Sequence, residues 1–307
     1  MYNMNSRQLQ YVTTVAEIGS ISAAAQKLYI SQPSLSQYIQ KIEAELGIEL
    51  FERTSPLRLT TAGHVYVETA KNILLEQAEL EKVINDIKDY QYGTLVIGTT
   101  PYCAAWILPP VIKEFHKCLP QIQIIMREGI EKILPQRAAV GEFDFVISSY
   151  PLSDREFVTE DLLSEDFVIA VPMEITSSPE FLHVDNIHEH PAVDLKQLGT
   201  LPFISMDNGF YLDMVVKRIL KKSGVTPKIV ARCSSMTTIY RILKTNIGIS
   251  ILPECMTRGF SPDITYLHIQ GNDERRSVKL SYRQTQYFSG AAKKFVEVFG
   301  EVWSGIE

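Results

Sequence analysis

The hydrophobic and polar positions between Ser31 and Gly47 follow the period of an α-helix. Apolar residues recur every three or four positions and would share one face: Leu35, Ile39, Ile42 and Leu46. Ser31 is suited to cap this helix, Pro33 is tolerated in its first turn, and Gly47 is suited to end it. The opposite face is unusual for a solvated helix because amides and hydroxyls precede any charge: Gln32, Ser34, Ser36, Gln37 and Gln40, then Lys41.

Two shorter helices are predicted upstream. The first has apolar residues at helical spacing: Leu9, Val12, Val15 and Ala16. The second covers SISAAAQKLYI, which we expect Ser22 to cap, and its three alanines would let another helix cross closely. Three short helices with a tight turn before the last describe a helix-turn-helix.

A basic turn follows the amide-rich helix. Arg53 and Arg58 flank Pro56, which is consistent with a small β-hairpin wing. In the major groove of DNA, Gln pairs bidentately with adenine, Ser serves either base, and Lys and Arg hold phosphates. The alternative is a solvated surface helix of unusual composition. We predict that the following residues contact DNA: Ser31, Gln32, Pro33, Ser34, Ser36, Gln37, Gln40, Lys41, Arg53 and Arg58.

The charge of the chain qualifies this prediction. The net charge is −6, which argues mildly against a nucleic-acid binder. Up to Tyr66 there are five basic and five acidic residues, so the segment is neutral. A few well-placed cations would have to suffice for DNA binding, and a dimer would supply them twice.

Four motifs occur in the order and spacing of a known family: AAAQKL, SQPSLSQYIQKIE, LGIELFER and LTTAG. Through them, residues 9–63 resemble the N-terminal region of LysR-type transcriptional regulators. The resemblance implies that Arg53 and Arg58 hold the DNA backbone and that four residues read the groove, namely Gln32, Ser34, Ser36 and Gln37. The chain departs from the family at Gln37 and Tyr38, where a basic residue is common.

Residues 61–88 are predicted to form one long helix. The segment has no Pro and no Gly after Gly63, and a heptad seam runs through Tyr66, Ala70, Ile73, Gln77, Leu80, Ile84 and Ile87. A helix of roughly 40 Å would be poorly covered by one small domain, so we expect it to pair with a second copy. Gln77 would then help to fix the register. The alternative is packing within one chain; the family resemblance implies dimerisation.

From residue 94 onward, short apolar runs alternate with helical stretches, which predicts an α/β architecture. The expected strands are Thr94–Gly98, Ile122–Met126, Phe143–Ile147, Phe167–Val171, Phe203–Ser205, Ile229–Ala231, Ile249–Leu252 and Val278–Tyr282. The expected helices include Leu108–His116, Met214–Lys222 and Ser235–Lys244.

The ends of these strands are rich in hydroxyls and poor in catalytic groups. Ligands bind beyond the carboxyl ends of strands in open sheets, so a small anion or polar metabolite is the expected ligand. Each residue taken singly could equally serve as capping or turn chemistry. The predicted effector-binding residues are Thr99, Thr100, Pro101, Tyr102, Cys103, Gly129, Ile130, Phe203, Ser205, Ser235 and Met236.

This part of the chain also resembles the effector domain of the same family, through the segments 98–129, GEFDFVIS, LPFI and IGISILPE. The resemblance implies a fold like that of periplasmic binding proteins, with one subdomain at 93–167 plus 269–303 and the other at 168–268. It places the effector between them, near Thr100, Tyr102, Ser205 and the start of the Ser235 helix. Tyr102 stands where the family commonly has Ser or Thr, which suggests a smaller or differently shaped pocket.

Two further groups of residues could carry chemistry. The run HVDNIHEHP has His183, His188 and His190 close together, which suits a transition metal, but we expect a polar loop and no metal. A reactive thiolate at Cys103 is conceivable, yet no second cysteine lies near it in the sequence, and small buried side chains are expected at all four cysteines.

The chain lacks the signatures of other protein classes. No GxSxG, Walker, HExxH or GxGxxG-helix motif is present, so neither an enzyme nor a cofactor is expected. No run of 18 apolar residues and no secretory signal is found, and the scattered cysteines fit a reduced cytosol. A solute-binding protein would share the C-terminal part but would have no use for the first ninety residues.

The combined prediction is an α/β protein that begins with an all-α winged helix-turn-helix at residues 1–60. A linker helix at 61–91 and an effector-binding domain at 92–307 follow. The expected partners are double-stranded promoter DNA, an unidentified small-molecule effector, a second copy in a dimer or tetramer, and RNA polymerase, with no membrane. The effector would change the angle between the subdomains and so the spacing of the DNA-reading heads.

Overall fold

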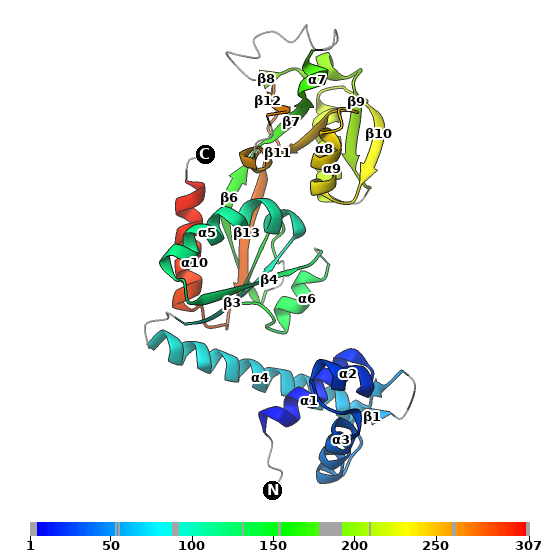
Figure 1. Cartoon of the computed structure of the whole chain (residues 1–307), viewed down its shortest axis with the longest axis vertical. Coiled ribbons are helices and arrows are strands. Elements are labelled where there is room, and N and C mark those ends of the chain that lie inside the picture. The colour runs from blue at the N-terminus through cyan, green and yellow to red at the C-terminus, as the bar shows by residue number, and fades with distance from the viewer. Residues whose placement is uncertain are drawn as a thin grey trace. The chain divides into compact units, whose positions relative to one another are not determined.

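The computed structural model of the chain describes residues 5–52, 54, 56–87, 92–130, 132–152, 155–177, 192–208, 210–259 and 262–304. The chain divides into two compact units, the N-terminal unit Met1–Tyr90 and the C-terminal unit Gln91–Glu307 (Figure 1). None of the helices in these described ranges is long and apolar enough to cross a membrane.

Three short helices, a two-stranded hairpin and a long helix make up the N-terminal unit. In order they are α1 (Ser6–Ile18), α2 (Ile21–Lys27), α3 (Gln32–Leu46), β1 (Phe51–Glu52), β2 (Arg58–Leu59) and α4 (Thr61–Ile87). The predicted apolar stripes form its core, since Val12, Leu35 and Ile42 are fully buried. This arrangement confirms the helix-turn-helix and the antiparallel wing.

The caps of α3 agree with the prediction, and the cap of α2 does not. Ser31 accepts a hydrogen bond from the Ser34 amide, and Gly47 ends α3 with a left-handed φ of 73°. Ser20, rather than Ser22, caps α2, because the backbone of Ser20 is extended and its hydroxyl accepts from the Ala23 amide. Ser22 therefore lies inside the first turn of α2.

The start of α4 is closely fitted to the wing. The Thr60 amide donates to the Leu50 carbonyl at 2.9 Å, and the Thr60 hydroxyl donates to the Glu49 carbonyl at 2.7 Å. A Cβ at Gly63 would overlap the Leu50 carbonyl oxygen. Glycine is therefore the residue that lets the helix approach the wing this closely.

The rest of α4 changes character along its length. Ala70 is buried within the N-terminal unit, and the Ser6 hydroxyl of α1 donates to Gln77 Oε1 at 2.7 Å. Gln77, a predicted seam residue, thus has a partner within its own chain. Four other seam residues have 40–79% of their surface exposed: Ile73, Leu80, Ile84 and Ile87.

A five-stranded sheet forms one half of the C-terminal unit, in the order β4-β3-β5-β13-β6. Its strands are β3 (Gly93–Thr99), β4 (Ile122–Glu128), β5 (Phe145–Ser148), β6 (Phe157–Glu165) and β13 (Arg276–Arg283). β3, β4 and β5 are parallel, whereas β13 is antiparallel to both β5 and β6.

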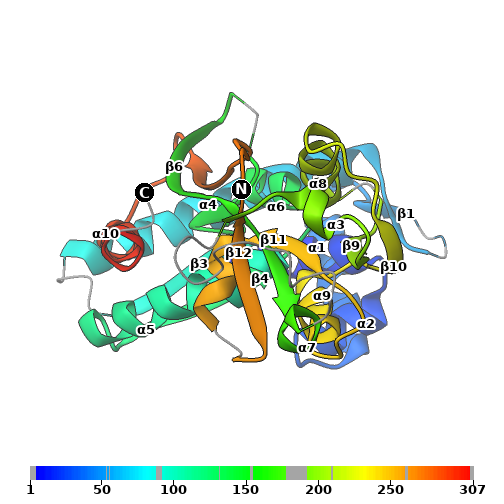
Figure 2. The same ribbon diagram turned by 90° about the horizontal axis from the view of Figure 1, so that it is seen from above.

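Helices cover both faces of this sheet. One face packs on α5 (Leu108–Cys118) and α10 (Gly290–Trp303), whose Phe115 and Phe295 rings lie 5.2 Å apart. The other face packs on α6 (Leu134–Ala139) through Leu134 and Val146 (Figures 1 and 2). Between β3 and α5 runs a π-helix, η1 (Cys103–Ile107).

The other half contains a four-stranded sheet in the order β11-β7-β12-β8 and a parallel pair, β9 with β10. A single bridge from Phe203 to Ile249 links the pair to β11. The elements are β7 (Phe167–Pro172), α7 (Met173–Thr176), β8 (Ala192–Val193), η2 (Leu195–Leu198), β9 (Pro202–Met206), α8 (Tyr211–Lys222), β10 (Lys228–Cys233), α9 (Met236–Leu243), β11 (Ser250–Pro253), η3 (Glu254–Gly259) and β12 (Ile264–Ile269).

The chain passes between the two halves at the β6–β7 junction and again between β12 and β13. All eight predicted strands and three predicted helices are present, with small shifts at their ends. The strands β6, β8 and β12 and the helix α10 were not predicted.

Candidate functional site

The predicted DNA-contacting face of α3 is exposed as a continuous surface. Gln32, Gln37 and Gln40 are exposed, while Leu35, Ile39 and Ile42 on the other side are buried. Ser36 is half-buried, and Pro33, Lys41 and Arg58 are exposed. Arg53 lies outside the described residues.

Local contacts explain how this face is held. The Ser31 and Ser34 hydroxyls lie 2.7 Å apart and serve the helix cap, so they are partly committed to local structure. Glu43 Oε1 accepts from the Leu50 and Phe51 amides at 2.8 and 3.1 Å, which ties the end of α3 to the wing. The reading helix and wing therefore form one structural piece.

The turn between α2 and α3 presents a residue that sequence reasoning missed. Tyr29 is 96% exposed and has a left-handed φ of 55°. A bulky residue rarely adopts this conformation. An exposed aromatic ring held this way, next to the N-terminus of α3, is a further candidate for a contact with DNA.

Most of the predicted effector-binding residues are buried in the C-terminal unit. The Thr99 hydroxyl donates to the Ile147 carbonyl at 2.9 Å, and the Thr100 hydroxyl accepts from the Cys103 amide at 3.4 Å. Phe203 lies in the core and Ser205 is 6% exposed. These side chains are thus packed in the structure, and their role in ligand binding stays a prediction.

Two predicted residues, Tyr102 and Met236, meet at a side chain that was not predicted. The Arg276 guanidinium lies 3.8 Å from the centroid of the Tyr102 ring, and its Nη1 lies 3.8 Å from the Met236 sulfur. Arg276 Nε donates to the Ser149 hydroxyl at 2.6 Å. Pro101, Gly129 and Ile130, all in the described ranges, are not part of this cluster.

Glu165 also lies in this buried cluster. The Tyr102 hydroxyl lies 2.9 Å from both carboxylate oxygens of Glu165, and the Cys255 amide donates to Oε2 at 3.0 Å. Arg276 Nε is 3.9 Å from Glu165 Oε1. The phenol at position 102 therefore holds a buried carboxylate.

Burial raises the pKa values of the acidic groups in and beside this cluster. Desolvation raises the pKa of Glu165, and the Arg276 charge opposes this rise. Desolvation likewise raises the pKa of Tyr102 and Cys103. A thiol with a raised pKa is a poor nucleophile, which agrees with the prediction that Cys103 is a small buried side chain.

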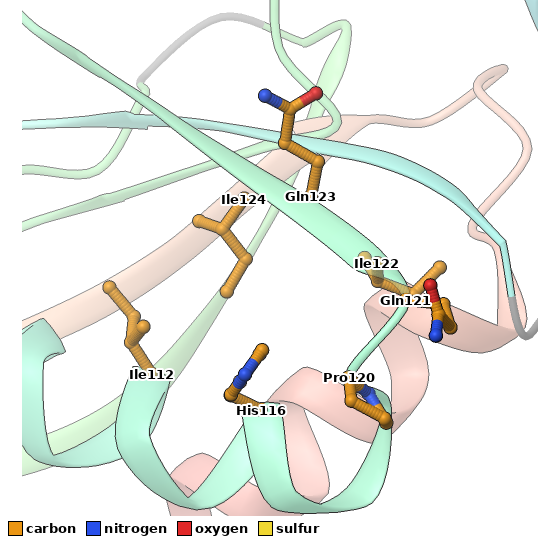
Figure 3. Close-up of a pocket in the computed structure, with 7 residues that line it drawn as sticks. All are labelled: Ile112, His116, Pro120, Gln121, Ile122, Gln123 and Ile124. Atoms are coloured by element: carbon orange, nitrogen blue, oxygen red, sulfur yellow. The ribbon is translucent and has the colours of Figure 1, made fainter.

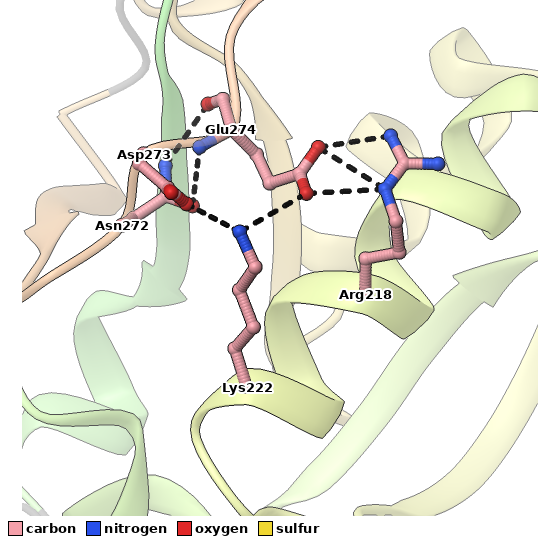
Figure 4. Close-up of polar contacts among 5 residues, drawn as sticks. All are labelled: Arg218, Lys222, Asn272, Asp273 and Glu274. Atoms are coloured by element: carbon pink, nitrogen blue, oxygen red, sulfur yellow. Dashed lines mark hydrogen bonds and ion pairs between the residues drawn. The ribbon is translucent and has the colours of Figure 1, made fainter.

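An ion-pair network stands beside the return crossing between β12 and β13 (Figure 4). Arg218 of α8 makes hydrogen bonds of 2.9–3.1 Å to both oxygens of Glu274. Lys222 lies 2.5 Å from Asp273 and 3.4 Å from Glu274. The same loop is turned by Asn272, which bonds the backbone of Glu274. This network fastens α8 to the chain just before Arg276.

A surface pocket lies away from all predicted residues, between α5 and the edge strand β4 (Figure 3). Its volume is about 380 Å³, and its lining is mostly apolar: Ile112, His116, Pro120, Gln121, Ile122, Gln123 and Ile124. It contains no carboxylate or arginine. The buried Arg276 cluster, which is rich in polar groups, is the stronger candidate for ligand chemistry.

Comparisons with known proteins decide the family. Residues 88–304 match the model of the LysR substrate binding domain, and residues 6–64 match that of the bacterial regulatory helix-turn-helix protein, lysR family. The chain belongs to the LysR family of bacterial transcriptional regulators. The predicted family and fold class are therefore confirmed.

Relatives of this LysR-family protein align over nearly its whole length. The uncharacterized regulator YcgK of Bacillus subtilis is 28% identical over 307 residues, covering 97% of this chain and 94% of YcgK. The regulator AlsR of the same organism is 25% identical, covering 96% and 95%. The dual regulator OxyR of Escherichia coli is 26% identical, covering 91% and 90%.

Solved structures of LysR-family proteins share the fold. The regulator CbnR is 22% identical with a TM-score of 0.65, covering 98% of this chain and 99% of CbnR. CbnR complexed with its target DNA has a TM-score of 0.66 at 22% identity, covering 97% and 100%. This identity supports a common architecture only.

The histidines weighed as metal ligands are His183, His188 and His190. Residues 183, 188 and 190 lie outside the described residues. Within the described part of this LysR-family chain, no group of three or more His, Cys, Asp or Glu side chains is arranged to hold a metal ion.

Proposed function

We propose that this LysR-family regulator binds promoter DNA sequence-specifically by placing α3 in the major groove. The observation that carries this proposal is the exposed amide and hydroxyl face of α3, opposite an apolar face on which Leu35, Ile39 and Ile42 are buried. Gln32 and Gln37 would read bases, while Lys41, Arg53 and Arg58 would hold phosphates. The complex of CbnR with its target DNA, a protein of the same fold, supports this use of the fold.

A dimer through α4 would supply the second reading head. The supporting observation is the row of exposed apolar residues on α4, from Ile73 to Ile87. Such a row loses its contact with water when it meets the same row of a second copy. Two heads also double the phosphate contacts available to a segment of neutral local charge.

The C-terminal unit would bind a small-molecule effector where its two halves meet. The proposed boundaries are 1–60 for the DNA-binding domain, 61–91 for the linker helix and 92–307 for the effector domain. Within the last, 93–167 plus 269–303 and 168–268 would form the two subdomains. Tyr102, Met236 and the newly found Arg276 support this location, because they come from both halves and contact one another.

This protein would act without catalysing a reaction and without a cofactor, in the cytoplasm where its promoter lies. Binding of effector would favour one arrangement of the two crossings and so one spacing of the reading heads, to which RNA polymerase would respond.

The test is footprinting of the full-length protein on the DNA upstream of its own coding region. A protected region containing two similar half-sites, with no protection of a scrambled sequence of equal composition, is expected. Equal affinity for both sequences would refute sequence-specific binding.

A further inference from the structure

We propose that Arg276, Ser149 and the first turn of α9 form a site for the anionic group of the effector, a carboxylate or another small oxyanion. This inference rests on the proposed effector-binding function and names the chemical class of its ligand. Its three parts come from β13, the end of β5 and the start of α9.

Arg276 is a buried cation with too few oxygen partners. It is only 4% exposed, and its hydrogen bonds go to the Ser149 hydroxyl and, at 3.8 Å, to the Met236 sulfur. Arg218, which is far more exposed, has three hydrogen bonds to Glu274. A guanidinium presents five donors in a fork that fits an oxyanion, and a thioether is a weak acceptor for it. Burying a charge this way is costly unless an anion completes the site.

Glu165 does not complete it. Its carboxylate is already committed to the Tyr102 hydroxyl and the Cys255 amide, and it approaches Arg276 only to 3.9 Å. Burial also raises the pKa of Glu165, against the opposing charge of Arg276. Among the described residues, no carboxylate therefore lies within hydrogen-bond distance of the Arg276 guanidinium.

The first turn of α9 adds donors on the same side. Met236 is its first residue, and its N-cap Ser235 makes no side-chain capping bond. No described residue accepts from the amides of Met236, Thr237 or Thr238. Unpaired amides at a helix N-terminus and the helix dipole both favour an anion. The Met236 side chain of this turn reaches the Arg276 guanidinium, so the turn and the guanidinium lie beside each other.

Met236 is the group that a ligand would displace. It is half-buried and flexible, and the Tyr102 ring covers a face of the guanidinium. An oxyanion that replaced the sulfur would exchange a weak acceptor for charged hydrogen bonds. The ligand would also join β13 of one half to α9 of the other, so its binding would bias how the two halves meet.

Thermal unfolding of the full-length protein tests the ligand class without knowing the effector. The probes are acetate, benzoate and succinate, their neutral amides, and inorganic sulfate, all at one ionic strength balanced with chloride. We expect at least one acid to raise the unfolding temperature while its amide does not. If sulfate alone raises the unfolding temperature, the site binds inorganic oxyanions. If each acid changes the unfolding temperature no more than its amide does, and sulfate has no effect, the proposal is overturned.

Two variants test whether the anion binds at Arg276. Arg276→Gln should weaken the responding anion at least about tenfold, since a charged hydrogen bond is lost. Arg241→Gln, which removes an exposed arginine from the same helix α9, is the matched control and should leave the response unchanged. Equal weakening in both variants would mean a general charge effect and would overturn the site.

A second variant covers the case in which Arg276→Gln does not fold. Met236→Glu places a tethered carboxylate against the guanidinium, so it should raise the basal unfolding temperature and abolish the response to anions. Met236→Gln is its neutral control. An unchanged anion response in Met236→Glu would overturn the proposal. Gel shifts on promoter DNA without anion distinguish failure of this proposal from failure of the proposed function. If the protein binds the promoter but does not respond to any anion, only the anion site is refuted.

Discussion

Glu165 and Arg276 face each other directly across strands β6 and β13, and both side chains are almost completely buried. These two strands carry the chain toward its two crossings between the halves of the C-terminal unit. The hydrogen bonds of Glu165 nevertheless come from Tyr102 and Cys255, so a third and a fourth residue maintain the pair. Changes to any of these groups should therefore affect the C-terminal unit as a whole.

Replacement of Tyr102 by Phe should destabilise the C-terminal unit by about 1–3 kcal/mol, because a buried carboxylate loses a hydroxyl donor. Urea unfolding of the full chain, followed by the transition of this unit, measures the loss. Tyr92→Phe is the control, since Tyr92 is 67% exposed. Equal stability of the two variants would mean that the Tyr102 hydroxyl contributes nothing.

The stability of the C-terminal unit should depend on the protonation of Glu165. Burial raises its pKa above the ordinary value of 4.5, against the opposing charge of Arg276. As pH rises above this ordinary value, the unfolded state releases the proton while the folded state keeps it. The free energy of unfolding should therefore fall, by at most about 1.4 kcal/mol per pH unit, until the folded pKa is passed. Glu165→Gln should remove this part of the slope in urea titrations, and an unchanged slope would contradict the assignment.

On α3, Gln32→Ala and Gln37→Ala should each cost about 1–3 kcal/mol of discrimination between the operator and a base-substituted operator, if the amide pairs bidentately with adenine. Gln10→Ala is the control, because Gln10 is an exposed glutamine of α1 rather than of α3. Gel shifts on both sequences give the difference. A uniform loss on both sequences would instead indicate a backbone contact.

Dimerisation should depend on the exposed seam of α4. Leu80→Asp places a charge in the apolar row and should weaken association by about 1.5–3 kcal/mol or more, since a buried leucine is lost. Ala78→Asp introduces the same charge at an exposed position off the seam. Sedimentation equilibrium distinguishes the two, and equal association constants would argue against pairing through this row.

Two glycine replacements test how closely the wing is fitted to α4. Gly63→Ala should destabilise the N-terminal unit by about 1–3 kcal/mol, because the new methyl group meets the Leu50 carbonyl. Gly300→Ala, in the open on α10, should instead stabilise its unit by about 0.4–1 kcal/mol. Thermal unfolding should show shifts of opposite sign; a stabilised Gly63→Ala would mean that the wing readily moves aside.

Sequence patterns predicted the fold well because periodicity reports burial. The helix α3 was predicted with its caps because its apolar stripe and its Ser31 and Gly47 agree. The strand β6 was missed because exposed acidic residues interrupt its apolar positions, and only its pairing with β13 makes it a strand. Pairing between distant segments leaves little local trace.

The candidate ligand site was harder to predict for a related reason. Arg276 lies in a charged run, NDERR, where a surface loop is the natural interpretation. In the structure Glu274 stays in the exposed network while Arg276, two residues later, is buried. The onset of strand alternation toward Val278 and Leu280, which are both buried, was the available signal. Thr99 and Phe203, which were also predicted for the site, are both buried, and their role in ligand binding stays a prediction.

The close seat of Gly63 on the wing has a mechanical consequence. Thr60 bonds the Glu49 and Leu50 carbonyls at this contact, and Glu43 bonds the wing to α3. The hairpin, the reading helix and the start of α4 therefore lack independent hinges. Torque applied at the far end of α4 would turn each head as a solid body. In a dimer, the effector would then change the angle between two rigid reading surfaces. That angle determines how many base pairs separate the half-sites that both surfaces can bind.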